Sequence, residues 1–335
     1  MGDLMHALPA LTEAKEHIAD ISFDWVVDKN FASVPSWHPL VDKTIVTDHR
    51  NWRRQLFSKK SRESLKEALN EINETNYDLV VDMQNNIKSA LVSYLSKHSV
   101  VGMDAKSVRE YPAHLAYSTK INVDKKLHAI ERQKKLLAEA LDYSSSMNNV
   151  DYGALLEGFI KPNMSLPSKY IVLVQNASWI TKQWSITKWQ KLIQYLDGKD
   201  IKMILPSGNL NELERAKEIS SVSTKAQALD LMPLNEIAYI IKNANFCICS
   251  DTGLAHLSAL SGTPSITLYG PTETALIGTY GENQIHIVGK NNDINNIKVS
   301  DVLENLEKNC DLIIYNKVNK KNNVFGSDSN KISII

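Results

Sequence analysis

The sequence predicts an α/β protein built from two Rossmann-like, doubly wound halves. Short apolar runs alternate with segments of helical periodicity along both halves, and polar turns separate them. The run 170–174 is unbroken and rich in β-branched residues, which is typical of a central parallel strand. The G-x-G-x-x-G pattern of dinucleotide enzymes does not occur in the sequence.

Bulk composition excludes several classes of protein. The chain of 335 residues is long enough for two domains, and its 38 Lys/Arg balance its 38 Asp/Glu, so we expect no general affinity for nucleic acid. No apolar run approaches the ~20 residues of a membrane span. Cys247, Cys249 and Cys310 are too few for a disulfide framework and are expected to be core residues in a reducing compartment.

The first half opens on a helix from Asp3 to about Ala19, with a bend expected at Pro9. The further strands expected in this half are 23–27, 43–47, 77–82 and 100–103, and the helices are 61–73 and 127–141. Residues 50–62 contain six Lys/Arg and no acid. They are interpreted either as a solvated loop or as a docking surface for an anionic substrate or membrane face.

The polar stretch 144–153 predicts a domain boundary, so the first domain is expected to span residues 1–150. The second domain, 151–316, contains expected strands at 170–174, 202–205, 245–250 and 264–269. Residues 317–335 are rich in Asn, Lys and Ser and are expected to form a disordered tail.

A turn at Asp251-Thr-Gly253 connects an expected strand to an expected helix that begins at about Gly253. A helix start offers unpaired N–H groups and partial positive charge, which suits a phosphate. Asp-Thr-Gly is also the signature of aspartic proteases, but those enzymes need two such aspartates that share a proton. The sequence contains one Asp-Thr-Gly and alternates strands with helices, so the protease is the weaker interpretation.

Several motifs together resemble glycosyltransferase family 9, the lipopolysaccharide heptosyltransferases. These motifs are Met1-Gly-Asp-Leu-Met-His-Ala-Leu-Pro-Ala-Leu11, Phe23-Asp-Trp-Val-Val27, Pro35-Ser-Trp-His38, Asp251-Thr-Gly-Leu-Ala-His256, Tyr269-Gly-Pro-Thr272 and Leu276-Ile-Gly-Thr-Tyr-Gly281. The likeness extends from Met1 to about Val288. It implies a GT-B fold, in which two Rossmann-like domains face a central cleft.

The resemblance also implies the reaction. It is an inverting transfer of heptose from ADP-L-glycero-β-D-manno-heptose to a Kdo sugar on lipid A, with no cofactor and no required metal. We therefore expect a cytoplasmic enzyme in peripheral contact with the inner membrane, and no nucleic-acid partner. Inversion needs one carboxylate to take the acceptor's proton, and the resemblance gives that role to Asp3.

Site residues for the donor follow from the same resemblance. Lys182 is expected at the phosphates, Glu212 at the ribose, Met232 at the adenine, and Asp251 either at helix capping or at heptose hydroxyls. The remaining donor residues are Ser178, Thr252, Gly253 and His256. The expected acceptor-binding residues are Arg53, Arg54, Lys59, Lys60, Arg62, Arg109, His128 and Arg132.

Two departures from the family keep alternatives open. Gln175-Asn-Ala-Ser178 replaces a His-Ala-Thr-Thr-like run, and the family's first strand, about ten residues long before Met-Gly-Asp, is missing. Loss of that central strand would leave its neighbours unpaired, so we expect either an upstream start or a poorly stable, weakly active protein. The alternatives are another family 9 transferase and a degenerate, non-catalytic protein that binds a nucleotide sugar.

Overall fold

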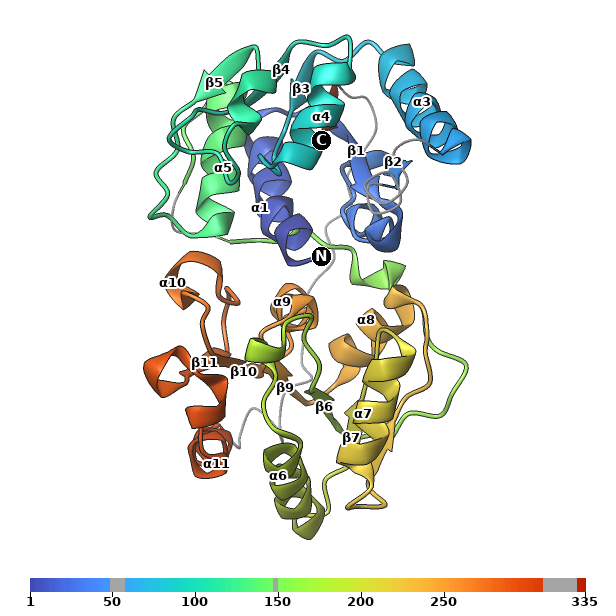
Figure 1. Cartoon of the computed structure of the whole chain (residues 1–335), viewed down its shortest axis with the longest axis vertical. Coiled ribbons are helices and arrows are strands. Elements are labelled where there is room, and N and C mark those ends of the chain that lie inside the picture. The colour runs from blue at the N-terminus through green and yellow to red at the C-terminus, as the bar shows by residue number, and fades with distance from the viewer. Residues whose placement is uncertain (49–57, 147–149, 310–329) are drawn as a thin grey trace. The chain divides into compact units, whose positions relative to one another are not determined.

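The computed structural model describes residues 1–48, 58–146, 150–309 and 330–335, without the side chains of Lys60, Asn330 and Lys331. The chain divides into two compact α/β units (Figure 1). The first contains Asp3–Leu155 together with the C-terminal segment Asn323–Ile335, and the second contains Leu156–Asn322. The division falls at residue 155, where the sequence analysis expected residue 150. Among the described residues, no helix is both long and apolar enough to cross a membrane.

The first unit holds a six-stranded parallel sheet in the order β2-β1-β12-β3-β4-β5. Its strands are β1 (Ile21–Asp28), β2 (Val41–Thr47), β3 (Leu79–Val81), β4 (Val100–Met103), β5 (Thr119–Ile121) and β12 (Asn330–Ile334). Its α-helices are α1 (Gly2–His17), α3 (Lys59–Glu74), α4 (Ile87–Leu95) and α5 (Ala129–Ala140). It also contains the short 3-10 helices η1 (Lys29–Phe31), η2 (Pro35–Trp37) and η3 (Ala113–Ala116).

The C-terminal strand β12 lies in the middle of this sheet, between β1 and β3. Ile332 is in register with Phe23 on one side and with Leu79 on the other. The Ile335 amide donates to the Val81 carbonyl at 2.9 Å, and the Ile335 carbonyl accepts from the Met83 amide at 3.0 Å. Figure 1 shows the C-terminal end of the chain within the first unit.

Two expectations from the sequence are therefore wrong. The strands on either side of the central position do not remain unpaired, because β12 pairs with both of them. A disordered tail over 317–335 is wrong for residues 330–334, which form a strand. The physical reason is apolar burial, since Ile332, Ile334 and Ile335 are 3%, 0% and 5% exposed. Residues 317–329 lie outside the described residues.

The second unit repeats the architecture with the strand order β11-β10-β9-β6-β7-β8, again all parallel. Its strands are β6 (Ile171–Val174), β7 (Met203–Leu205), β8 (Ala226–Ala228), β9 (Phe246–Ser250), β10 (Ser265–Tyr269) and β11 (Gln284–Val288). Its helices are α6 (Ile186–Gly198), α7 (Leu210–Ser220), α8 (Leu234–Asn243), α9 (Gly253–Leu260), α10 (Thr274–Ile277) and α11 (Val299–Lys308).

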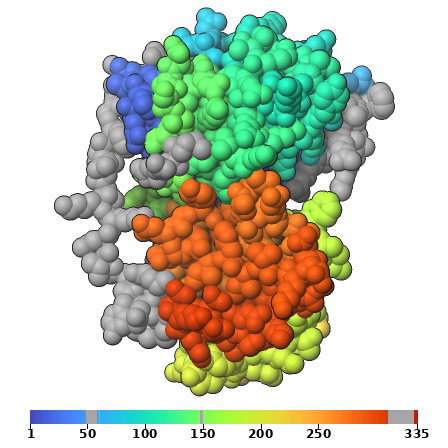
Figure 2. Space-filling model, turned by 90° about the vertical axis from the view of Figure 1, so that its left-hand side faces the viewer, coloured from blue at the N-terminus to red at the C-terminus, as the bar shows by residue number. Residues whose placement is uncertain are grey.

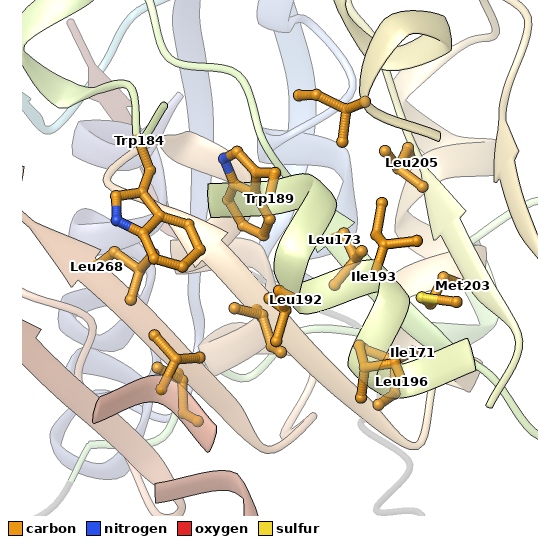
Figure 3. Close-up of a cluster of buried hydrophobic side chains, with 14 of the residues drawn as sticks. Ile171, Leu173, Trp184, Trp189, Leu192, Ile193, Leu196, Met203, Leu205 and Leu268 are labelled. Carbon is orange, nitrogen blue, oxygen red and sulfur yellow. The ribbon is translucent and has the colours of Figure 1, made fainter. Parts of the chain in front are cut away.

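Period-2 alternation in β9 and β10 divides the second unit's core between the two faces of its sheet. Phe246 and Ile248 point into a cluster with side chains of α6, α7 and α11, whereas the alternate Cys247 and Cys249 are buried outside that cluster. Helix α9 packs on β9 and β10 and against α8. Trp184 and Trp189 anchor the first cluster, with ring centroids 5.3 Å apart in an edge-to-face arrangement (Figure 3). The predicted α/β class with two Rossmann-like units is confirmed.

Candidate active site

The first candidate group of the active site is the carboxylate of Asp3, in the first turn of α1. Met1 is the N-cap of this helix, so Asp3 is not the capping residue. Gln84 donates a side-chain hydrogen bond to its Oδ2 at 3.0 Å, and the guanidinium of Arg109 forms an ion pair with the same oxygen. The opposite face of α1 fixes the helix, because Met5, Leu8 and Leu11 are fully buried.

The environment of Asp3 favours its ionised form. Burial acts to raise the pKa of this carboxyl, but the pKa is lowered because Arg109, the N-terminal amino group and Gln84 all stabilise the anion. Asp3 is therefore ionised at neutral pH. Its side chain is 45% exposed, so a substrate hydroxyl can approach it. This combination suits a general base.

A buried network fixes the turn that carries Gln84. Asp82, fully buried at the end of β3, accepts hydrogen bonds from the Gln84 amide at 3.0 Å, the Asn85 amide at 2.8 Å and the Tyr117 hydroxyl at 2.8 Å. Burial raises the pKa of Asp82 to about 6. The Tyr117 ring packs directly on Gly102 of β4, where an added Cβ would lie 2.4 Å from a ring carbon.

The sequence analysis did not assign roles to Gln84 or Asp82. The polar residues 84–86 directly follow the expected strand 77–82, and that position was the available signal. The carboxyl ends of parallel strands are where an open α/β sheet places its ligands.

The second candidate group is a pair of side chains, Lys182 and Asp251. It lies where the strand order of the second sheet reverses, between β6 and β9. Lys182 ends the turn that follows β6, and Asp251 follows β9 directly. The Lys182 ammonium lies 2.7 Å from the Asp251 carboxylate, and the Thr272 hydroxyl donates to the same oxygen. Asp251 is 7% exposed, so this carboxylate holds Lys182 from a rigid, buried position.

Helix α9 begins at Gly253 as predicted, with Thr252 as its N-cap residue. The expected capping role of Asp251 is therefore wrong, since its carboxylate pairs with Lys182 instead. Within the described residues the Thr252 side chain makes no capping hydrogen bond. The helix start thus offers backbone N–H groups and partial positive charge beside an ammonium group, which suits a diphosphate.

The other predicted donor residues also lie in the second unit. Ser178 is exposed in the turn after β6, Met232 is half-buried before α8, and His256 is buried in α9. Glu212 lies in the first turn of α7 and accepts hydrogen bonds from the Gly208 amide and the Asn209 side chain, each at 2.9 Å. Its carboxylate organises the turn after β7, and its ribose contact remains a prediction.

Among the predicted acceptor residues that the structure describes, three lie near one another and near α1. Arg109 pairs with Asp3, and Arg132 is close enough to Arg109 for the two positive charges to interact. The His128 ring lies 5.6 Å from the His6 ring of α1. Lys59, in contrast, is exposed at the start of α3, 3.8 Å from Glu63. His128 caps α5 by accepting from the Ile130 amide at 3.2 Å.

The remaining predicted acceptor residues are only partly covered by the structure. Arg53 and Arg54 lie outside the described residues, and so does the side chain of Lys60. Arg62 is exposed on α3. Arg132 is half-buried and donates to the Ser107 carbonyl, so it fixes a loop of the first unit. Of the acceptor residues that the structure describes, Arg109 is the one that pairs with the Asp3 carboxylate.

Asp-Thr-Gly in this chain belongs to a strand-to-helix turn of a parallel sheet, and its carboxylate is paired with a lysine. An aspartic protease needs a carboxylate that shares a proton with a second one. The protease interpretation is therefore wrong.

Comparison with known proteins identifies relatives along nearly the whole chain. Residues 63–307 match glycosyltransferase family 9 (heptosyltransferase). Lipopolysaccharide heptosyltransferase 1 of Escherichia coli (strain K12) is 38% identical over 310 residues, which cover 91% of this chain and 96% of that protein. The enzyme of the same name from Pseudomonas aeruginosa is 36% identical over 288 residues, covering 86% and 81%.

Solved structures agree with the sequence matches. E. coli heptosyltransferase WaaC with ADP is 36% identical, with a TM-score of 0.85 over 92% of this chain and 96% of that chain. The same enzyme with ADP-2-deoxy-2-fluoro heptose gives 35% identity and a TM-score of 0.83, over 92% and 96%. The predicted resemblance and the GT-B fold class are confirmed.

Proposed function

The chain belongs to glycosyltransferase family 9, the heptosyltransferases, and on that premise we propose that it transfers L-glycero-D-manno-heptose from ADP-heptose to Kdo of Kdo-lipid A. This is the heptosyltransferase I step of lipopolysaccharide inner-core synthesis. The observation that carries the proposal is the ionised, partly exposed Asp3 carboxylate held by Arg109 and Gln84.

In the proposed reaction Asp3 acts as the general base. A Kdo hydroxyl attacks the anomeric carbon of the heptose from the face opposite the diphosphate, and its proton passes to the Asp3 carboxylate. The bond from the anomeric carbon to the phosphate oxygen breaks, ADP leaves with the electron pair, and the configuration inverts. The lowered pKa of Asp3 keeps it unprotonated before the attack.

The donor residues offset the charge that develops on ADP. Lys182, oriented by Asp251, supplies a positive charge, and the first N–H groups of α9 supply hydrogen bonds. We propose that these groups hold the diphosphate and that the reaction requires no cofactor or metal. Glu212 and Met232 would receive the adenosine.

For the acceptor, we propose that the Arg109 guanidinium meets the Kdo carboxylate. A carboxylate on the acceptor competes with Asp3 for the same guanidinium, so acceptor binding would loosen the Asp3–Arg109 ion pair and make the base stronger. Because the acceptor is a membrane glycolipid, we place the enzyme on the cytoplasmic face of the inner membrane.

Product detection with ADP-heptose and Kdo-lipid A tests the function. We expect heptosylated Kdo-lipid A from the wild type and little product from Asp3→Asn. Turnover by Asp3→Asn at the wild-type rate would refute the assignment of the base. Replacing the donor by another nucleotide sugar, or the acceptor by a heptosylated one, distinguishes a different family 9 transferase. Retained ADP binding without any transfer would indicate the degenerate, non-catalytic alternative.

A further inference from the structure

Helix α4 presents its apolar side to solvent. Ile87, Leu91, Tyr94 and Leu95 recur at the spacing of one helical stripe and are 53%, 45%, 73% and 39% exposed. The opposite side, which includes Ala90 and Val92, is buried. An amphipathic surface helix normally buries its large apolar side chains, so this orientation indicates a surface that is covered in use.

The exposed stripe continues onto the neighbouring segment. Helix α4 packs against η3, where Leu115 is 71% exposed, and Tyr111, two residues before η3, is 74% exposed. The Ile87 amide donates to the Glu110 side chain at 3.0 Å, which joins the start of α4 to this segment. We call Ile87, Leu91, Tyr94, Leu95, Tyr111 and Leu115 the α4–η3 face. In Figure 2 these elements belong to the teal and green part of the first unit.

This face begins at the candidate acceptor site. Gln84 and Arg109, the two partners of the Asp3 carboxylate, are followed within three residues by Ile87 and Tyr111. The Arg109 amide donates to the Asn85 carbonyl at 3.1 Å, so both segments leave the site side by side. A molecule whose polar end reaches Asp3 therefore has an apolar surface next to that end.

The two segments that carry the face contain more basic than acidic residues. Segments 87–98 and 109–120 contain Lys88, Lys97, Arg109 and Lys120 but a single acid, Glu110, in a chain whose net charge is zero. All four cationic side chains are exposed. Tyr94 and Tyr111 add rings with an apolar body and a polar tip, which favour the boundary between water and lipid.

We propose that the α4–η3 face docks onto an anionic lipid bilayer at its headgroup–acyl boundary and presents Asp3 to an acceptor in that bilayer. The inference rests on the proposed function, because that function makes the acceptor a glycolipid. A second protein or a second copy of the chain fits less well, since neither explains why the apolar stripe begins at the acceptor site and carries excess positive charge.

The test compares the full-length wild type with Leu91→Gln/Leu115→Gln. Both side chains are exposed, so the folded state is expected to persist. The matched control is Ile160→Gln/Val288→Gln, which changes two apolar side chains that are 54% and 50% exposed in the second unit. Vesicles of phosphatidylethanolamine and phosphatidylglycerol serve as the anionic membrane, and phosphatidylcholine vesicles as the neutral one.

We expect the wild type and the control to co-sediment with anionic vesicles and only weakly with neutral ones. Leu91→Gln/Leu115→Gln should bind anionic vesicles at least tenfold more weakly. Equal binding by the variant and the wild type, or no binding by the wild type, would overturn the proposal. So would a wild-type dimer in solution that the substitutions at 91 and 115 dissociate.

A paired activity assay separates this inference from the proposed function. With a deacylated, water-soluble Kdo acceptor, the variant and the wild type should turn over equally. With the acceptor embedded in vesicles, the variant should be at least tenfold slower. Absence of transfer to either acceptor would refute the transferase proposal, whereas an equal rate on vesicles would refute membrane docking.

Discussion

The two sheets have the same architecture but are assembled differently. The second sheet takes all six strands from one continuous stretch, from Ile171 to Val288. The first takes five strands from 21–121 and its central one from residues 330–334. A central position in a parallel sheet requires an apolar strand that pairs on both sides, and it does not matter which part of the chain supplies it.

The C-terminal strand β12 is more deeply buried than the edge strands of the second sheet. Edge strands β8 and β11 of the second sheet are only partly buried, whereas β12 has Ile332 and Ile334 3% and 0% exposed. The first unit thus depends on a segment more than 200 residues distant along the sequence from β5, the last of its other strands.

The largest effect, a loss of stability of the first unit, is expected from Ile334→Asp. This substitution places a carboxylate in a fully buried position of the central strand, at a cost on the order of 4 kcal/mol or more. Hydrogen exchange should show that the amides of β1 and β3 lose protection while those of β6 and β9 keep it. Val288→Asp, on the half-exposed edge strand β11, is the control and should change little. Full protection of β1 and β3 in Ile334→Asp would show that the first sheet does not need β12.

Asp3→Asn should lower kcat by about 10²–10⁴-fold, because the amide cannot accept the acceptor proton. ADP binding, which we assign to the second unit, should remain at the wild-type level in calorimetry. Glu16→Gln, an exposed carboxyl on the same helix, should retain activity. A parallel loss of ADP affinity in Asp3→Asn would contradict the assignment of the two roles to separate units.

The stability of the first unit should depend on pH through the titration of the Asp82 carboxyl. Its pKa is raised by burial from 3.8 to about 6, so the folded state binds this proton more tightly than the unfolded state does. Relative to Asp82→Asn, the stability of the wild type should therefore fall as pH rises from about 4 to about 6 and then level off. At ~1.4 kcal/mol per pKa unit, the total decline is about 3 kcal/mol.

Hydrogen exchange of the β3 and β4 amides, compared between the two proteins at each pH, measures this decline. Asp82→Asn isolates the contribution of one carboxyl, because other groups titrate alike in both proteins. A constant stability difference between pH 4 and 7 would mean that Asp82 has an ordinary pKa.

The smallest effect, a loss of ADP affinity, is expected from Lys182→Met in the second unit. Loss of one charged hydrogen-bond donor should weaken ADP binding roughly tenfold, because the ammonium is partly exposed and screened. Exchange protection in the first sheet should not change. Lys217→Met, an exposed lysine of α7, is the control. Unchanged ADP affinity in Lys182→Met would indicate that the lysine serves only to pair with Asp251.

Local features were predictable from the sequence. The start of α9 at Gly253, the strand at 170–174 and the polar turn after β3 all follow from periodicity, capping and turn composition, which depend on neighbouring residues. The capping role expected for Asp251 failed because a capping preference does not register a lysine 69 residues earlier in the chain.

The α/β class, the two Rossmann-like halves and the motifs of a family 9 transferase were predictable from the sequence. Three features became apparent only in the folded protein: residues 330–334 complete the first sheet, Arg109 and Gln84 hold Asp3, and Asp251 holds Lys182. The two sets of features depend on interactions over different distances along the chain. Periodicity and capping are set by residues a few positions apart, whereas strand pairing and buried ion pairs are set by which distant segments the folded core brings together.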